Sequence, residues 1–117
     1  MKITIQVMSP PYTYEDLDTA IKIAEAGLKK GHEVRIFLFS DAVLAVNTKV
    51  KPVRSDRIIP EKLKELIKQG LRVDICGICM DYRGLTADMI IEGANPSGLP
   101  ELAQLIFTSD IFINLTA

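Results

Sequence analysis

The sequence predicts one α/β domain over residues 1–117, with a parallel sheet covered by helices on both faces. Short apolar runs rich in β-branched residues recur along the chain, and stretches with helical spacing of their apolar residues separate them. Strands that alternate with helical stretches of about 10 to 15 residues indicate βαβ units. Such units connect by right-handed crossovers, so the strands are expected to lie parallel.

The first part of the chain contains two predicted strands and one long helix. Lys2–Met8 has β-branched residues at alternate positions, and the proline pair that follows cannot donate ladder hydrogen bonds. Thr13 is the predicted cap of a helix over Tyr14–Lys30. Gly31 ends this helix, and Glu33–Phe39 is a nearly continuous apolar run, as expected for a strand buried on both faces.

Two shorter helices are predicted next. Ser40 and Asp41 are placed to cap a helix over Ala42–Val46. Residues 47–59 have no regular pattern, and the proline that follows them is typical of a helix start, here Glu61–Gln69.

Three further strands complete the expected sheet. Leu71–Ile75 is the third strand, Met89–Ile91 is a candidate fourth strand, and Ile111–Leu115 is the last. A helix is predicted over Pro100–Thr108, between the last two strands.

The composition excludes several classes of function. Fifteen acidic residues nearly balance fourteen basic ones, so the overall charge gives no sign of a nucleic-acid or membrane partner. No apolar run approaches the roughly 20 residues of a membrane span, and the first strand pattern begins without a signal peptide. Two cysteines without a secretory context favour the reducing cytoplasm. The hydrophobic content of 48% favours some apolar surface buried in an oligomer.

The segment Cys76–Gly84 is the most informative part of the chain. It contains the only two cysteines, three positions apart, directly after the strand predicted over Leu71–Ile75. Ligands of parallel sheets bind outside the carboxyl ends of the strands, so we expect Cys76 to be open to approach. The Cys-x-x-Cys spacing favours the thiolate, which is the nucleophilic form of the side chain. Cys76 is therefore the first candidate for a catalytic residue.

Cys79 has two interpretations that the residues alone leave open. If residues 78–83 form a helical turn closed by Gly84, Cys79 faces Cys76 and is able to form a disulfide with it. The alternative is a packed thiol of the core behind Cys76.

Ser40, Asp41 and Arg83 are weaker candidates for binding residues. Ser40 and Asp41 follow a predicted strand, so they are expected at the same sheet edge as the thiols, either as helix caps or as groups beside Cys76. Arg83 is expected to reach a thiolate only by folding back, and otherwise to pair with Asp81 or lie at the surface.

The rest of the chain offers little other chemistry. A zinc site needs about four ligands, and the single histidine is predicted on the opposite sheet edge, so no metal and no cofactor are expected. The segment from Asn47 to Arg57 carries a local charge of +3, because four basic residues oppose one acidic residue, Asp56. It is expected to be a solvated loop, or else to dock an acidic protein or tRNA, although it lacks aromatic residues for stacking on bases.

Three segments together resemble one known family. Phe37–Val43, Cys76–Gly84 and Leu99–Gln104 occur in the order and spacing of the DsrE/DsrF-like sulfur-relay family, nearest its YchN-like branch. The resemblance implies a three-layer α/β/α sandwich with a five-stranded parallel sheet, assembled as a homotrimer or homohexamer. It implies that Cys76 carries sulfane sulfur as a persulfide between donor and acceptor proteins, with Cys79 matching a second cysteine that many members have.

Two other functions are compatible with the same residues. The first is a thiol–disulfide redox protein that uses Cys76 and Cys79, although no tryptophan precedes the motif as it does in thioredoxin-like proteins. The second is a non-catalytic oligomeric module that binds a small ligand and whose thiols only pack.

Overall fold

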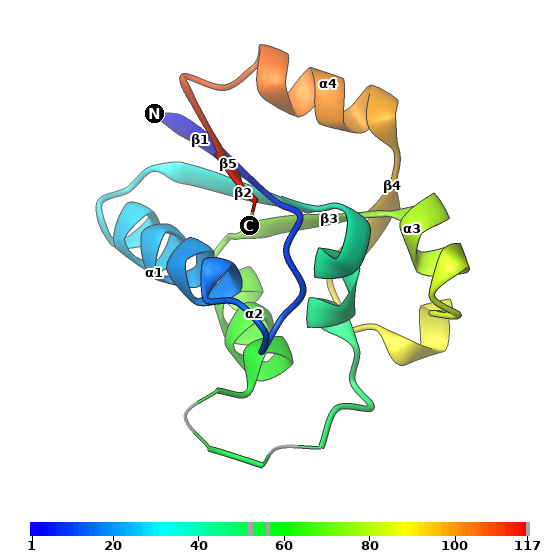
Figure 1. Ribbon diagram of the computed structural model, residues 1–117. Coiled ribbons are helices and arrows are strands. Elements are labelled where there is room, and N and C mark those ends of the chain that lie inside the picture. Colours follow the sequence, from blue (N-terminus) through cyan, green and yellow to red (C-terminus); the bar gives the residue numbers. More distant parts are fainter. Residues whose placement is uncertain (52, 56, 117) are drawn as a thin grey trace.

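The computed structural model describes residues 1–51, 53–55 and 57–116 and contains a five-stranded parallel sheet with helices on both faces (Figure 1). The strand order is β4-β3-β2-β1-β5. The elements in chain order are β1 (Lys2–Val7), α1 (Asp16–Lys29), β2 (Glu33–Leu38), the 3₁₀ helix η1 (Ser40–Val46), α2 (Ile59–Lys68), β3 (Arg72–Cys76), α3 (Gly77–Tyr82), the 3₁₀ turn η2 (Ala87–Met89), β4 (Ala94–Ser97), α4 (Leu99–Phe107) and β5 (Ile111–Leu115). The α/β sandwich with a five-stranded parallel sheet is therefore confirmed.

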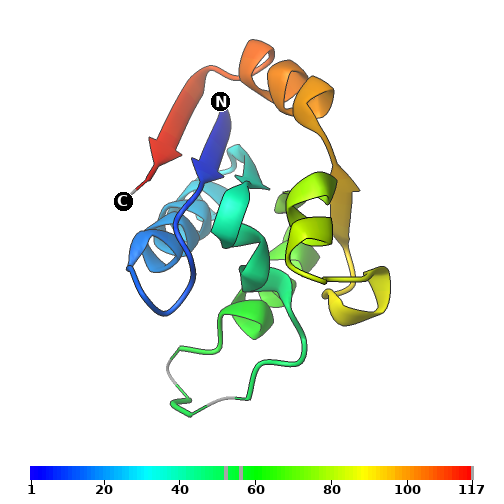
Figure 2. The ribbon, with the colours of Figure 1, turned by 45° about the vertical axis from the view of Figure 1, so that its right-hand side comes forward.

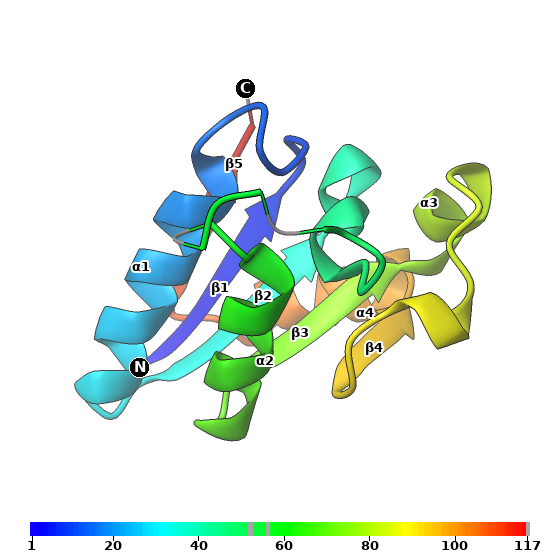
Figure 3. The ribbon, with the colours of Figure 1, turned by 90° about the horizontal axis from the view of Figure 1, so that it is seen from below.

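The helices divide unequally between the two faces of the sheet. Helices α1 and α2 lie side by side on one face, and α4 lies alone on the other (Figures 1 and 3). The 3₁₀ helix η1 and the short helix α3 follow β2 and β3, so both lie at the carboxyl edge of the sheet (Figure 2). This edge is where the candidate residues collect.

The side chains of the strands differ sharply between the two faces. The face toward α1 and α2 is aliphatic and buried, and Gly27 of α1 approaches it so closely that a Cβ there would lie 2.8 Å from Val34. The face toward α4 contains buried polar groups. Arg35 donates hydrogen bonds to the hydroxyl of Thr4 and, at 3.0 Å, to the carbonyl of Leu105 in α4. Alternation along the strands therefore separates an aliphatic layer from a polar one.

The start of helix α1 and its cap differ from the sequence prediction. Helix α1 begins at Asp16 instead of Tyr14, and its N-cap position is Glu15, which makes no side-chain capping bond. Thr13 is therefore not the cap. Tyr12 has a positive φ of 71°, so the chain turns here before the helix starts, and Ser9 reaches Asp16 with a hydrogen bond from its hydroxyl. The predicted helix end is confirmed, because Gly31 has the left-handed conformation.

The predicted fourth strand is in the wrong place. Residues 89–91 lie at the end of η2 and beyond it, where the N–H of Ile91 donates to the carbonyl of Val46. These apolar residues pack against the end of η1 instead of joining the sheet. The fourth strand is the Ala-Asn-Pro-Ser segment of β4, which has low strand propensity but lies at the sheet edge, where a proline is tolerated.

Within the described residues, none of the helices has the length and apolar character that crossing a membrane requires.

Candidate functional site at the carboxyl end of β3

The two cysteines lie where strand β3 passes directly into helix α3. Cys76 is the last residue of the strand and the N-cap residue of the helix, and Cys79 lies in the first helical turn. Gly84 has a φ of 67° just beyond the helix, so the predicted helical turn closed by glycine is found. Strand end, turn and glycine together bring the two side chains to one side of the junction.

A short series of hydrogen bonds links the two sulfur atoms to the backbone. The N–H of Cys79 donates to Sγ of Cys76 at 3.4 Å, and the N–H of Ser40 donates to Sγ of Cys79 at 3.3 Å. Both cysteines are free thiols in this structure. Each sulfur atom therefore accepts a hydrogen bond from one backbone N–H.

Ser40 contributes through its backbone and not as a helix cap. The N-cap position of η1 is Phe39, and no side-chain capping bond is present there, so the predicted cap role of Ser40 and Asp41 is wrong. Ser40 instead adopts a positive φ of 58°, which is uncommon for a residue other than glycine. This left-handed conformation is the one in which its N–H meets the sulfur of Cys79.

Arg83 joins α3 to η1. Its Nε and Nη2 atoms both donate to one carboxylate oxygen of Asp41, at 2.9 and 2.7 Å, and Nη1 donates to the carbonyl of Cys79 at 3.0 Å. The predicted alternative of a pair with Asp81 is therefore not found. The side chain does fold back toward the thiols, but it reaches the backbone of Cys79 and not a sulfur atom.

The thiols are more enclosed than the sequence predicts. Only 5% of Cys76 and 9% of Cys79 is exposed, and both belong to the hydrophobic core. The expected open approach to Cys76 is therefore not found. The reason is that α3 folds back against η1, where the Arg83–Asp41 pair joins the two elements. Little of either thiol is therefore open to a partner in this arrangement.

Burial also sets the acidity of the second thiol. Removal from water raises the pKa of Cys79, because the charged thiolate loses its hydration. A hydrogen bond with the Cys76 side chain raises the pKa of Cys79 further, while the N–H of Ser40 and the charge of Arg83 act in the opposite direction. Cys79 is consequently a protonated thiol near neutral pH.

A buried acidic group that sequence reasoning did not single out lies two residues before Cys76. Asp74 is only 1% exposed and accepts two hydrogen bonds from the guanidinium of Arg72, at 2.9 and 3.0 Å. The hydroxyl of Ser97, which pairs in register with Cys76, also donates to Asp74. The signal in the sequence is an acidic residue inside an apolar strand, which requires a buried partner.

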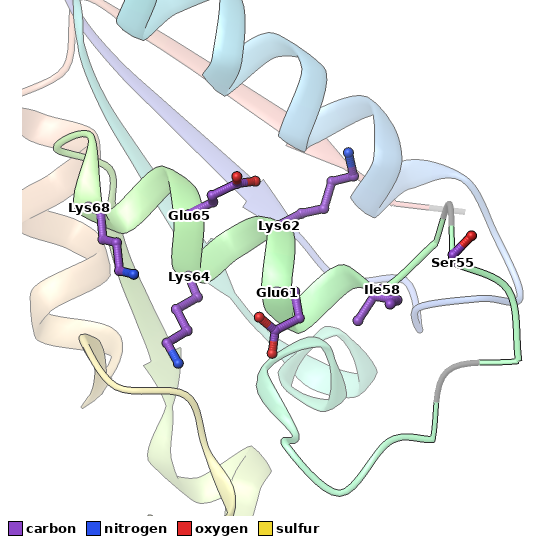
Figure 4. A pocket seen from close by; sticks show the side chains of 7 residues that line it. All are labelled: Ser55, Ile58, Glu61, Lys62, Lys64, Glu65 and Lys68. Carbon is purple, nitrogen blue, oxygen red and sulfur yellow. The ribbon is translucent and has the colours of Figure 1, made fainter.

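The basic segment after η1 lies apart from the thiols. Three cavities share Ile58 just before α2 as a lining residue, and Figure 4 shows one, which is lined by lysine and glutamate side chains of α2. A second cavity of 330 Å³ is lined by Tyr12, Val50, Lys51, Val53, Arg54, Arg57 and Ile58. Arg57 pairs with Asp18 at 2.7 Å, so its charge is already balanced. Asp56, part of the predicted charge of this segment, lies outside the described residues, and docking there stays a prediction.

Comparison with known proteins gives the family. The DsrE/DsrF-like family matches residues 1–115. The chain belongs to this family. The YchN protein of Escherichia coli is 33% identical over 111 residues, which cover 93% of this chain and 94% of YchN. Its crystal structure superposes with a TM-score of 0.90 and covers 98% of this chain and 99% of that one, at 32% identity.

Two DsrE-like relatives are named as sulfurtransferases. A putative sulfurtransferase DsrE of Allochromatium vinosum is 33% identical over 87 residues, which cover 73% of this chain and 67% of the relative. The sulfurtransferase TusD of Enterobacter sp. is 27% identical over 123 residues, which cover 94% of this chain and 96% of TusD. The DsrE-like fold and the link to sulfur-transferring relatives therefore agree with the resemblance found in the sequence.

Proposed function

We propose that this protein is a sulfur-relay protein that accepts sulfane sulfur as a persulfide on Cys76 and passes it to an acceptor. The observation that carries the proposal is the hydrogen bond from the N–H of Cys79 to Sγ of Cys76 at the strand end. This N–H is placed to donate to the sulfur atom that would exchange, at a strand end where parallel sheets bind ligands. Relatives that are named as sulfurtransferases support the same class of chemistry.

The proposed loading step is an exchange between two sulfur atoms. The Cys76 thiolate attacks the terminal sulfur of a donor persulfide, a new S–S bond forms, and the S–S bond of the donor breaks. The donor leaves as a thiolate, and Cys76 holds the added sulfur as a persulfide. Delivery repeats the exchange in reverse, with an acceptor thiolate attacking the terminal sulfur and Cys76 leaving as a thiolate.

In this proposal helix α3 moves away from η1 during both steps, because both thiols are largely enclosed. It contains six residues, and Gly77 and Gly84 bracket its start and end. Ser40, Asp41 and Arg83 hold it in the closed position by the contacts described above. In this proposal they are positioning residues, because Ser40 and Arg83 contact Cys79 directly and Asp41 orients Arg83.

The test is intact mass spectrometry after incubation with a cysteine desulfurase and cysteine. We expect wild type to gain the mass of one sulfur atom, Cys76→Ser to gain none, and Cys79→Ser to keep the gain. An unchanged wild-type mass, or an equal gain on Cys76→Ser, would exclude the relay function.

The sequence also allowed two other functions, and separate measurements distinguish them. A thiol–disulfide redox protein is expected to reduce insulin catalytically with a dithiol reductant, whereas a relay protein is not. A non-catalytic binding module is expected to keep its ligand and its cellular function in Cys76→Ala. Two free thiols three positions apart at the β3–α3 junction fit both exchange chemistries, and sulfur loading on Cys76 is the result that selects the relay.

The partners are a donor protein, an acceptor protein and further copies of this chain. We propose self-association as a homotrimer or homohexamer through the exposed apolar side chains of α4 and β5. Phe107 is 89% exposed, and Ile106, Ile111 and Phe112 lie near it in sequence and are also exposed. Apolar groups in this number favour burial against another protein surface. Location in the cytoplasm and contact with tRNA stay predictions.

A further inference from the structure

We infer that Cys79 is a resolving thiol that removes sulfur from Cys76 when no acceptor arrives, releasing it as sulfide and leaving a Cys76–Cys79 disulfide. The inference rests on the proposed function, because it concerns the fate of the persulfide on Cys76. It adds a sulfide-releasing activity to the relay and assigns Cys79 a catalytic role.

The placement of Cys79 supports a direct attack on Cys76. The backbone nitrogen of Cys79 lies 3.4 Å from Sγ of Cys76, so the two residues are in direct contact. The two residues are three positions apart across a strand-to-helix junction, with Cys76 at the N-cap. Residues at this spacing on a helix face each other, and a disulfide needs no long-range rearrangement of the backbone.

The attack balances without any outside oxidant. The Cys79 thiolate attacks Sγ of Cys76, an S–S bond forms between the two residues, and the bond from Sγ to the added sulfur breaks. The added sulfur leaves as hydrosulfide and takes up a proton. The sulfane sulfur is reduced, and the two cysteine sulfur atoms are oxidised. A dithiol reductant of the thioredoxin class then returns the disulfide to two thiols.

The surroundings of Cys79 delay this attack so that delivery has time to occur. Its burial and the neighbouring Cys76 of β3 keep the thiol protonated, whereas the Ser40 N–H of η1 and the guanidinium of Arg83 favour the thiolate. Asp41 of η1 holds the same guanidinium through one carboxylate oxygen. Because a protonated thiol does not attack, the release is expected to be slow at neutral pH and faster as the pH rises.

The experiment loads the protein chemically, with inorganic polysulfide under anaerobic conditions, and then removes the excess reagent. Mass spectrometry and a sulfide assay follow the loaded protein over time at several pH values. Wild type is expected to lose the added sulfur, release one equivalent of sulfide and end two hydrogen atoms lighter than the reduced protein. In Cys79→Ser and Cys79→Ala the added sulfur is expected to persist at least about tenfold longer.

Two controls separate the effect of the thiol from that of packing. Ile78→Ser makes a similar polar change on an exposed position of the same helix and is expected to decay like wild type. Circular dichroism of each variant checks that the fold is kept. Decay of Cys79→Ser at the wild-type rate, or release of sulfide without a disulfide, would overturn the inference.

The result also separates this inference from the relay proposal. If a desulfurase does not load wild type but polysulfide-loaded wild type still releases sulfide through the disulfide, the relay fails and the resolving role stands. If neither the desulfurase nor polysulfide places sulfur on wild type or on Cys79→Ser, both are overturned.

Discussion

The backbone N–H of Ser40 donates a hydrogen bond to the sulfur of Cys79 at 3.3 Å, across 39 positions of the sequence. This contact joins the start of η1 to the first turn of α3. Together with the Arg83–Asp41 ion pair, this contact holds α3, which follows β3, against η1, which follows β2. Both follow neighbouring strands of a parallel sheet, which is why their ends meet at one edge.

The Arg83–Asp41 pair is expected to limit access to the thiols. In Asp41→Asn the charge that orients Arg83 is lost, so α3 opens more often and both thiols react faster with iodoacetamide. An exposed pair contributes about 0–1 kcal/mol, so the reaction rate should rise by up to about fivefold with little change in overall stability. Asp18→Asn breaks the equally short pair with Arg57 and serves as the control. Equal labelling rates in both variants would show that the pair does not hold α3 closed.

The left-handed conformation of Ser40 is expected to dictate which residues fit there. Ser40→Val places a β-branched residue at a φ of 58° and should cost about 1–3 kcal/mol of unfolding free energy. Ser40→Gly adopts this conformation freely and keeps the N–H, so its unfolding free energy should stay within about 1 kcal/mol of wild type. Urea unfolding monitored by circular dichroism measures both. A valine variant as stable as the glycine variant would contradict the assigned backbone conformation.

The raised pKa of Cys79 predicts its pH response. Because burial favours the thiol form, alkylation of Cys79 should reach half of its maximal rate at a higher pH than an exposed cysteine does. The same shift affects stability. The folded state holds this proton more tightly than the unfolded chain, so the contribution to stability is complete below the unfolded pKa and is lost as the pH rises through the folded pKa.

Site-resolved mass spectrometry of pulse-labelled Cys76→Ser protein measures the alkylation rate of Cys79 alone. A peptide of residues 77–84 provides the reference for the unfolded thiol. If the pH at half-maximal alkylation of Cys79 lies at or below that of the peptide, burial does not raise the pKa of this thiol.

The exposed aromatic group of α4 is expected to lie in a contact between copies of the chain. Phe107→Ser should lower the particle mass measured by light scattering, because the most exposed apolar side chain of this surface is removed. Tyr14→Ser, an exposed aromatic change before α1, is the control and should leave the particle mass unchanged. A monomeric wild type would contradict self-association directly.

The sequence predicted the elements better than it predicted the contacts between them. Long stretches with clear spacing, such as α1 and β2, are set by local patterns and by glycine at their ends. Strand β4 was missed, because its Ala-Asn-Pro-Ser segment owes its position to the neighbouring strand and not to its own propensity. The pattern of residues within a segment does not indicate which distant strand that segment pairs with.

The thiol site illustrates the same limit. The position of Cys76 at a strand end and the turn closed by Gly84 follow from residues close in sequence. The pairing of Arg83 with Asp41, the backbone turn at Ser40 and the enclosure of both sulfur atoms all depend on how η1 and α3 pack. These features decide how reactive the thiols are, and the sequence patterns do not determine them.

The contrast between the aliphatic and polar faces of the sheet has a consequence for folding. Moving β3 by one residue against β2 would turn Asp74 and its partner Arg72 together into the aliphatic layer beneath α1 and α2, so a charged pair would lie among apolar side chains. Misaligned pairings of this strand are therefore strongly disfavoured. The same alignment keeps Cys76, at the carboxyl end of β3, paired with Ser97 in every correctly folded molecule.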